Sequence, residues 1–231
     1  MIDHPAMIDW QPLWLSFRLA GITTLLLLFL AIPLGYWLAY SRQRWKIAIE
    51  ALVSLPMVLP PTVIGFYLLL AFSPSHAFGR FLDHYLDTRL VFTFPGLVVA
   101  SLLYSLPFMV NPIIAGFSSL SPNLRAASRT LGKSDRTTLI RILLPNIRPS
   151  LITGTVLSFA HTIGEFGVVM MIGGSIPGQT RVASVAIYDE VQSINYSLAN
   201  RYALLLLAFS FVILLLVYVV NHHFNHAKTL P

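Results

Sequence analysis

Residues 126–145 read AASRTLGKSDRTTLIRILLP, and this stretch decides how the rest of the chain is interpreted. It lies within 118–148, a segment with six Lys and Arg side chains and one acid, Asp135, in a chain with only 10% charged residues. Gly132-Lys133-Ser134 matches the end of a phosphate-binding loop, G-x-x-x-x-G-K-[ST]. That loop requires a glycine five residues earlier, where backbone amides approach the phosphates, and this chain has Ala127 there. The segment is therefore not predicted to bind a nucleotide.

The composition is typical of an integral membrane protein. The 231 residues are 56% hydrophobic with a mean hydropathy of +0.73, and 10% are charged, against about 25% in a soluble domain. The chain has no cysteine, which excludes disulfides, thiolate metal sites and cysteine nucleophiles. We expect no catalytic residue, no cofactor and no metal site. The first thirteen residues contain no Lys or Arg, so we expect no cleavable signal peptide.

Five stretches are apolar enough to cross a bilayer, whose core of about 30 Å needs about 20 helical residues. A single all-α membrane domain over 1–231 is expected, with spans near 14–40, 48–72, 95–117, 149–172 and 202–221. A sixth span within 176–200 is the alternative, although charged side chains there argue against it. Basic loops favour the cytoplasm. The loops at 41–46 and 118–148 therefore predict an external N-terminus and a cytoplasmic C-terminus.

The basic segment has the signals of two short helices joined by a turn. Ser121 and Pro122 start the first helix, predicted over 122–131, and Gly132 suits a left-handed turn. Ser134 caps a second run, which Pro145 is expected to end. Three interpretations follow: a solvated basic loop near lipid headgroups, a nucleic-acid-binding segment, or a helix that docks into a cytoplasmic protein. Nucleic acid is not expected because the sequence contains no recognition fold. The docking face would comprise Leu120, Leu124, Ala127 and Leu131.

The segment resembles the motif of ABC-importer permeases, which is E-A-A, three residues, G, nine residues, I, one residue and L-P. Ala126-Ala127-Ser128, Gly132, Ile142 and Leu144-Pro145 keep this spacing in full. Ala126 replaces the family's Glu, which puts one polar contact with the ATPase in doubt, and Ser128 replaces its second Ala. The stretches 54–70 and 159–181 and the chain length are similar to permeases of molybdate ABC transporters.

The resemblance implies the type I permease fold in a bacterial inner membrane. It also implies a second copy of the chain, two cytoplasmic ATPase subunits that carry out ATP hydrolysis, and an external binding protein that delivers an oxyanion. Tungstate or sulfate is the runner-up substrate; a stand-alone channel or secondary carrier using Glu165 and His161 is the alternative from another class. The residues expected to couple to the ATPase are Leu124, Arg125, Ala126, Ala127, Ser128, Arg129, Leu131 and Gly132.

Candidate residues for a translocation path lie in two of the expected spans. Thr155, Ser158, Thr162 and Glu165 share one face of a helix at spacings of three and four. The hydroxyls of Thr155, Ser158 and Thr162 either line a path for a dianion or bond to the backbone of their own helix and serve packing. Glu165 would repel an anion, so we expect a structural or gating role, with Arg181 or Arg201 as its partner. Pro60 and Pro61 either break the second span beside a path or only kink it.

Three further segments have weaker signals. Segment 73–94 is expected to be an external loop with a short amphipathic helix at 77–86. The turn-rich stretch 173–181 is either a contact for the binding protein or a connector. The cluster of His222, His223 and His226 is expected to be solvated.

Overall fold

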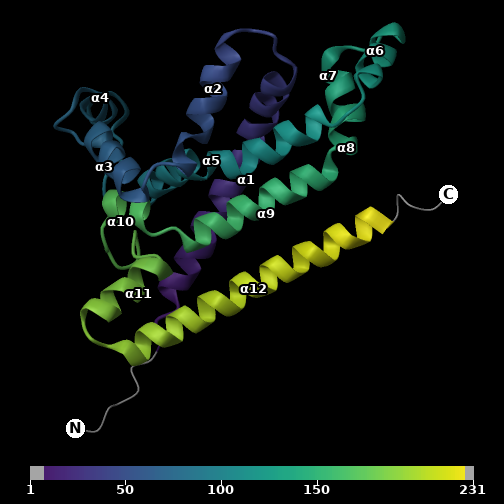
Figure 1. The fold of residues 1–231 in the computed structure, drawn as a ribbon. Coiled ribbons are helices and arrows are strands. Elements are labelled where there is room, and N and C mark those ends of the chain that lie inside the picture. The colour runs from purple at the N-terminus through teal and green to yellow at the C-terminus, as the bar shows by residue number, and fades with distance from the viewer. Residues whose placement is uncertain (1–7, 227–231) are drawn as a thin grey trace.

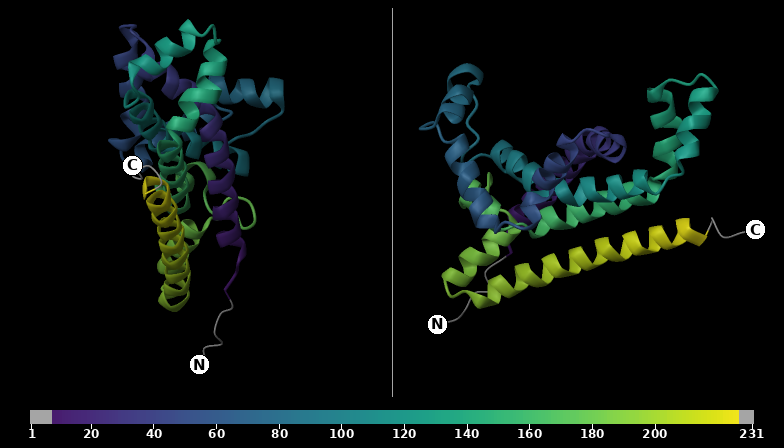
Figure 2. Two further views of the ribbon diagram at one scale, coloured as in Figure 1. Left: turned by 90° about the vertical axis from the view of Figure 1, so that its right-hand side faces the viewer. Right: turned by 45° about the horizontal axis from the view of Figure 1, so that its top comes forward.

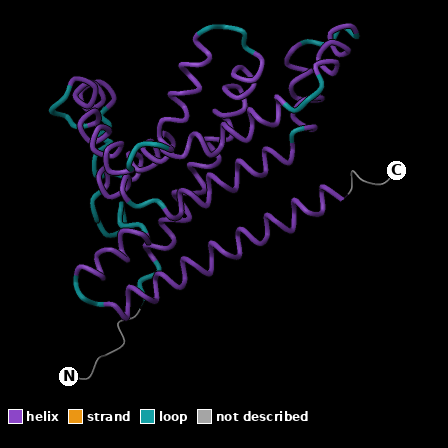
Figure 3. The backbone as a smooth tube through the Cα atoms, viewed as in Figure 1, coloured by secondary structure: helices purple, strands orange, loops and turns teal. Residues whose placement is uncertain are grey.

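The computed structural model describes residues 8–226 and contains, over that range, helices and no strand (Figures 1 and 3). Three long helices pack together at its centre, namely α1 (Gln11–Tyr40), α5 (Phe94–Ser118) and α9 (Arg148–Gly164), and α12 (Tyr196–His226) lies outside them against α9 and α11. The shorter elements are α2 (Trp45–Ser54), the 3-10 turn η1 (Leu55–Met57), α3 (Pro61–Phe72), α4 (Ala77–Leu86), α6 (Pro122–Thr130), α7 (Asp135–Thr138), the π-helical turn η2 (Leu139–Leu143), α8 (Leu144–Asn146), α10 (Gly167–Gly173) and α11 (Ala183–Gln192). The all-α prediction is confirmed.

The described helices give up to five membrane spans. α1, α5 and the first part of α12 are each long and apolar enough to span alone. Two bent pairs complete the set: α2–η1 with α3, bent by 109°, and α9 with α10, bent by 59°. α11 has ten residues, a length of about 15 Å at 1.5 Å per residue, and is too short to supply the alternative sixth span.

The two breaks have different local causes. In the second span, Pro60 is extended with ψ 137° and Pro61 begins α3. Proline lacks an amide hydrogen, so two in succession cannot continue a helix, and the predicted break is confirmed. The break in the fourth span was not predicted. It falls at Glu165, which is extended with ψ 129° and is far in sequence from the nearest prolines, Pro149 and Pro177.

The broken spans meet, because glycines allow their backbones to approach closely. A Cβ atom added to Gly65 in α3 would lie 2.7 Å from Cβ of Met171 in α10. One added to Gly167 would lie 2.8 Å from Cβ of Pro61. α3 and α10 therefore pack as one unit in which the two breaks are neighbours.

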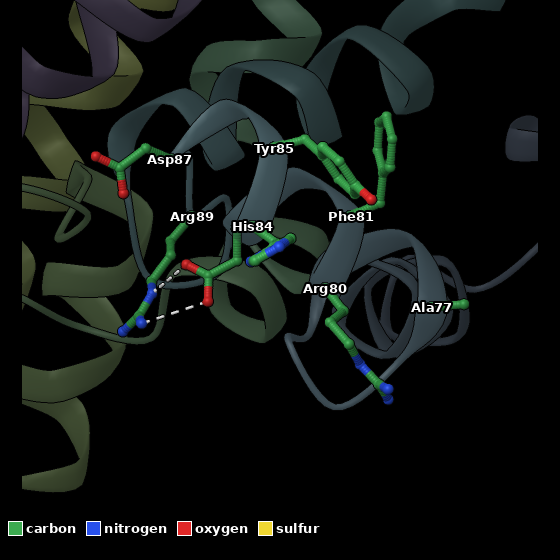
Figure 4. A pocket seen from close by; sticks show the side chains of 8 residues that line it. Ala77, Arg80, Phe81, His84, Tyr85, Asp87 and Arg89 are labelled. Carbon is green, nitrogen blue, oxygen red and sulfur yellow. Dashed lines mark hydrogen bonds and ion pairs between the residues drawn. The ribbon is translucent and has the colours of Figure 1, made fainter.

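The basic segment and the α4 region lie at opposite ends of the molecule (Figures 1 and 2). α6, α7 and α8 project beyond the ends of α5 and α9, whereas α4, α10 and α11 gather at the other end. α4 coincides with the helix predicted at 77–86. It borders a cavity of about 810 Å³, beside which Arg89 Nε lies 2.8 Å from Oδ1 of Asp83 (Figure 4).

Candidate functional site

The projecting basic segment has the helix–glycine–helix geometry expected from the sequence. The Ser121 hydroxyl accepts a hydrogen bond from the Asn123 amide at 3.3 Å at the start of α6. Gly132 follows the helix with φ +68°, in the left-handed region that glycine adopts without strain. The next amide, that of Lys133, donates to the Ser128 carbonyl at 3.1 Å, which closes the helix in a Schellman arrangement. The Ser134 hydroxyl then accepts from the Thr137 amide at 3.2 Å.

Pro145 does not end the second helix, so that prediction is wrong. The chain widens into the π-helical turn η2, in which the Leu144 amide bonds to the Leu139 carbonyl five residues earlier. Helical structure then continues through Pro145 to Asn146. A π-turn accommodates the proline because it shifts the hydrogen-bond register just before the residue that lacks a donor.

Ser128 joins α6 to α7. Its hydroxyl oxygen lies 2.7 Å from that of Thr138, and both side chains are buried. The Thr138 hydroxyl already donates to the Ser134 carbonyl at 3.0 Å, so Ser128 donates to Thr138. The Ser128 side chain, one of the predicted ATPase-coupling residues, is buried and holds the two helices together, and its part in coupling stays a prediction.

The predicted apolar face of α6 is divided between the interior and the surface. Leu120 precedes α6 and packs against the buried cluster that includes Phe117, and Leu124 is half-buried. Ala127 and Leu131 are exposed, Leu131 to 74%. The face open to a partner is therefore shorter than the sequence indicated, because the first apolar residues serve to attach α6 to the bundle. Gly132, Ala126 and Arg129 are also exposed.

Arg125 turns toward the bundle and away from the exposed face. Its guanidinium carbon lies 4.5 Å from the ring centre of Tyr40 and 5.4 Å from that of Tyr36, in the last turns of α1. The Tyr40 hydroxyl donates to the Phe117 carbonyl at 3.1 Å. These contacts connect the ends of α1 and α5 to α6.

The polar stripe of α9 makes contacts inside the protein. The hydroxyl of Thr155 donates to the Leu151 carbonyl at 2.8 Å, and that of Thr162 to the Ser158 carbonyl at 2.9 Å. The Ser105 hydroxyl of α5 lies 3.0 Å from the Thr162 hydroxyl. These contacts favour the packing alternative for the stripe. The Ser105 hydroxyl also lies 2.9 Å from Nδ1 of His161, whose ring stacks on Phe108. The Ser158 hydroxyl is buried and has no hydrogen-bond partner in the part of the chain that the structure describes.

Glu165 is buried at the break between α9 and α10, with 4% of its surface exposed. The Ser101 hydroxyl lies near its carboxyl group, but neither carboxyl oxygen has a hydrogen-bond partner among the described residues. Arg181 pairs with Asp189 at 3.0 Å and Glu190 at 3.2 Å, and Glu165 makes no ion pair within the described residues. The predicted pairing of Glu165 with Arg181 or Arg201 is wrong. Glu165 instead supports the break through its backbone, because its carbonyl accepts from the Ser184 hydroxyl at 2.6 Å.

In the described part of the chain, no group of three or more His, Cys, Asp or Glu side chains is placed so that it could hold a metal ion. The cluster of His222, His223 and His226 lies at the end of α12, where side chains fall outside the described residues.

Comparisons with known proteins identify the class of protein to which this bundle of broken and continuous spans belongs. Residues 31–228 match the family model described as "Binding-protein-dependent transport system inner membrane component". The chain belongs to this family, as the motif spacing predicted, and its fold is that of the type I permeases.

Among curated relatives, the chain is 44% identical to the molybdenum transport system permease protein ModB of Azotobacter vinelandii, over 91% of this chain and 93% of that protein. It is 31% identical to the sulfate transport system permease protein CysT of Escherichia coli, over 83% of this chain and 70% of that protein. Among solved structures, the chain is similar to one of the inward-facing methionine ABC transporter MetNI, with a TM-score of 0.73 at 15% identity. The match covers 96% of this chain and 99% of that chain. A bacterial importer of alginate gives a TM-score of 0.76 at 17% identity, covering 92% of this chain and 78% of that one.

Proposed function

We propose that the chain is the permease subunit of an ATP-driven importer of molybdate. The observation that carries this proposal is the similarity to a molybdenum permease along nearly the whole of both chains. Similarity to sulfate permeases is lower and covers less of those proteins, so sulfate is the second candidate within the same class, together with tungstate. The chain itself contributes no catalytic residue; ATP hydrolysis belongs to separate subunits.

The projecting segment is the proposed attachment point for a cytoplasmic ATPase. Ala127 and Leu131 give α6 an exposed apolar face, and apolar helix faces of this kind dock into grooves of partner proteins. The hydrogen bond between Ser128 and Thr138 joins α6 and α7 into one rigid unit, and η2 and α8 connect this unit to α9. Because each chain has one such segment, two copies of the chain would bind two ATPase subunits. In this assembly the N-terminus lies outside, and the external binding protein contacts the α4 end.

The proposed translocation path runs beside the two neighbouring breaks. Pro60, Pro61 and Thr62 are exposed at the start of α3, and the amino end of a half-helix directs its positive dipole end toward an anionic substrate. We place Thr155, Ser158 and Thr162 of α9 beside this path; the Thr155 and Thr162 hydroxyls bond to their own helix, whereas the buried Ser158 hydroxyl makes no such bond. Glu165 is then a structural element of the break, kept away from the anion by its burial.

Substrate identity is tested with the external binding protein that serves this permease, because it makes the first selection. Isothermal titration with molybdate, tungstate and sulfate should give the tightest affinity for molybdate. A tightest affinity for sulfate would contradict the proposed substrate and leave the permease class intact.

Docking is tested with single cysteines, which are unique because the chain has none of its own. Ala127→Cys and Leu131→Cys should each cross-link to the ATPase in the assembled transporter. Ser75→Cys, exposed at the opposite end, is the matched control and should not. Equal cross-linking from all three positions, or none from α6, would exclude α6 as the docking helix.

A further inference from the structure

A basic cavity lies between the bundle and the projecting basic segment 118–148, which we call the attachment segment. Its volume is about 720 Å³, and its walls come from the end of α1, the end of α5 and the first two turns of α6. Three arginines line it, Arg42, Arg125 and Arg129, and no acidic residue does. Charge of one sign in a partly enclosed space attracts a counter-ion.

The charges in this cavity are incompletely neutralised within the described residues. Arg129 pairs with Asp135 at 3.2 Å, and both side chains are largely exposed. Arg42 and Arg125 make no ion pair with any described residue. The Nε atom of Arg125 is buried and has no hydrogen-bond acceptor among the described residues. A buried guanidinium donor without an acceptor is costly, which indicates that an acceptor is supplied from outside the chain.

The walls of the cavity suit a group that is anionic at one end and apolar at the other. Tyr40 is held in place by its bond to the Phe117 carbonyl and by the guanidinium of Arg125 over its ring. Phe117, Leu120 and Ala39 add apolar surface. Tyr36, Trp37 and Tyr40 fall in the last turn of a spanning helix, the level at which aromatic side chains meet lipid headgroups.

We propose that this cavity binds the phosphate of an anionic phospholipid from the adjacent leaflet, with Arg125 and Arg42 as its ligands. A tetrahedral oxyanion alone would contact only the polar side of the cavity, whereas a glycerophosphate headgroup also contacts the apolar wall of Ala39, Phe117 and Leu120. Bound there, the lipid bridges α1 to α6 and fixes the position of the docking helix relative to the bundle. This inference is independent of the substrate that the transporter carries.

The test uses the assembled transporter in nanodiscs containing phosphatidylglycerol and phosphatidylcholine, with retained lipid counted by native mass spectrometry. Arg125→Gln should lower phosphatidylglycerol retention about fivefold, the effect of one basic residue at an anionic membrane surface. Ala126→Glu, which introduces a carboxylate at an exposed position that lines the cavity, should lower it at least as much. Arg141→Gln removes an exposed charge of the same segment outside the cavity and should leave retention unchanged.

Four outcomes would overturn the proposal. Equal retention in all variants would show that the cavity holds no lipid, and an equal loss in Arg141→Gln would show a diffuse charge effect. Displacement of the phosphatidylglycerol by inorganic phosphate or molybdate at millimolar concentration, with no dependence on the acyl chains, would identify a free oxyanion as the ligand. Absence of retained lipid in the assembled transporter, with lipid present on the permease alone, would assign the cavity to the ATPase.

Discussion

Replacing Thr138 with valine should loosen the attachment segment without unfolding the bundle. In the native chain Ser128 donates to Thr138, and Thr138 donates to the Ser134 carbonyl. Valine keeps the shape and removes both bonds. The Ser128 hydroxyl, 2% exposed, then has a proton and no acceptor, which costs about 1–3 kcal/mol. Local opening of 122–138 should therefore become about 5- to 150-fold more frequent.

The matched variant is Ser128→Ala, which removes the donor and leaves the Thr138 hydroxyl bonded to Ser134. Its cost should be smaller, about 0.5–1.5 kcal/mol. The double variant should be no worse than Thr138→Val alone, because it contains no unpaired donor.

Hydrogen exchange measured by mass spectrometry on the assembled transporter follows the opening directly. Peptides covering 122–138 should exchange faster in the order Thr138→Val, Ser128→Ala, wild type, and peptides covering α4 at the opposite end should be unchanged. A wild-type rate in Thr138→Val would show that the two hydroxyls do not hold α6 to α7. An equal acceleration in α4 would show that the substitution weakens the whole fold.

Three substitutions within the spans have distinct expectations. Gly65→Ala places a Cβ atom 2.7 Å from Cβ of Met171 and should lower thermal stability by about 1–3 kcal/mol; an unchanged unfolding midpoint would show that α3 and α10 are not packed at this distance. Thr162→Val removes the contact with Ser105 and should cost about 0.6 kcal/mol in a thermal melt, whereas slower uptake at full stability would place this side chain in the path. Glu165→Gln should melt no earlier than wild type, because a buried carboxyl without an ionic partner costs free energy whenever it is charged; an earlier melt would indicate a partner for the charged form.

The local features of the attachment segment could be predicted because each depends on neighbouring residues. Ser121 and Ser134 cap helices through amides two or three positions away, and Gly132 adopts the positive φ that a helix end requires. The spacing of this segment and the apolar runs were then sufficient for the family and the all-α membrane fold. Pro145 was misjudged for a reason of the same kind, because a π-turn relieves the missing hydrogen bond before the proline is reached.

The tertiary contacts could not be predicted, since their partners are distant in sequence. The place of Ser128 in the motif indicated a contact with another protein, yet its hydroxyl bonds to Thr138 ten residues later. Arg125 stacks on Tyr40, and the basic pattern alone does not distinguish a stacked arginine from a solvated one. The break at Glu165 had a weak signal, an acid between Gly164 and Gly167 in an apolar run. That signal did not predict a bend, which becomes visible only in the structure, where α10 packs against α3.

Uptake of radiolabelled molybdate into proteoliposomes that contain the permease, its ATPase and its binding protein tests most directly whether α6 transmits ATP hydrolysis to transport. Wild type should accumulate molybdate only when ATP and all three components are present. Gly132→Pro should insert in equal amount and show neither uptake nor stimulated ATP hydrolysis. Proline fixes φ at about −65°, whereas the turn has φ +68° and the Gly132 amide is bonded to the Arg129 carbonyl. Wild-type uptake by Gly132→Pro, or uptake without ATP, would contradict this mechanism.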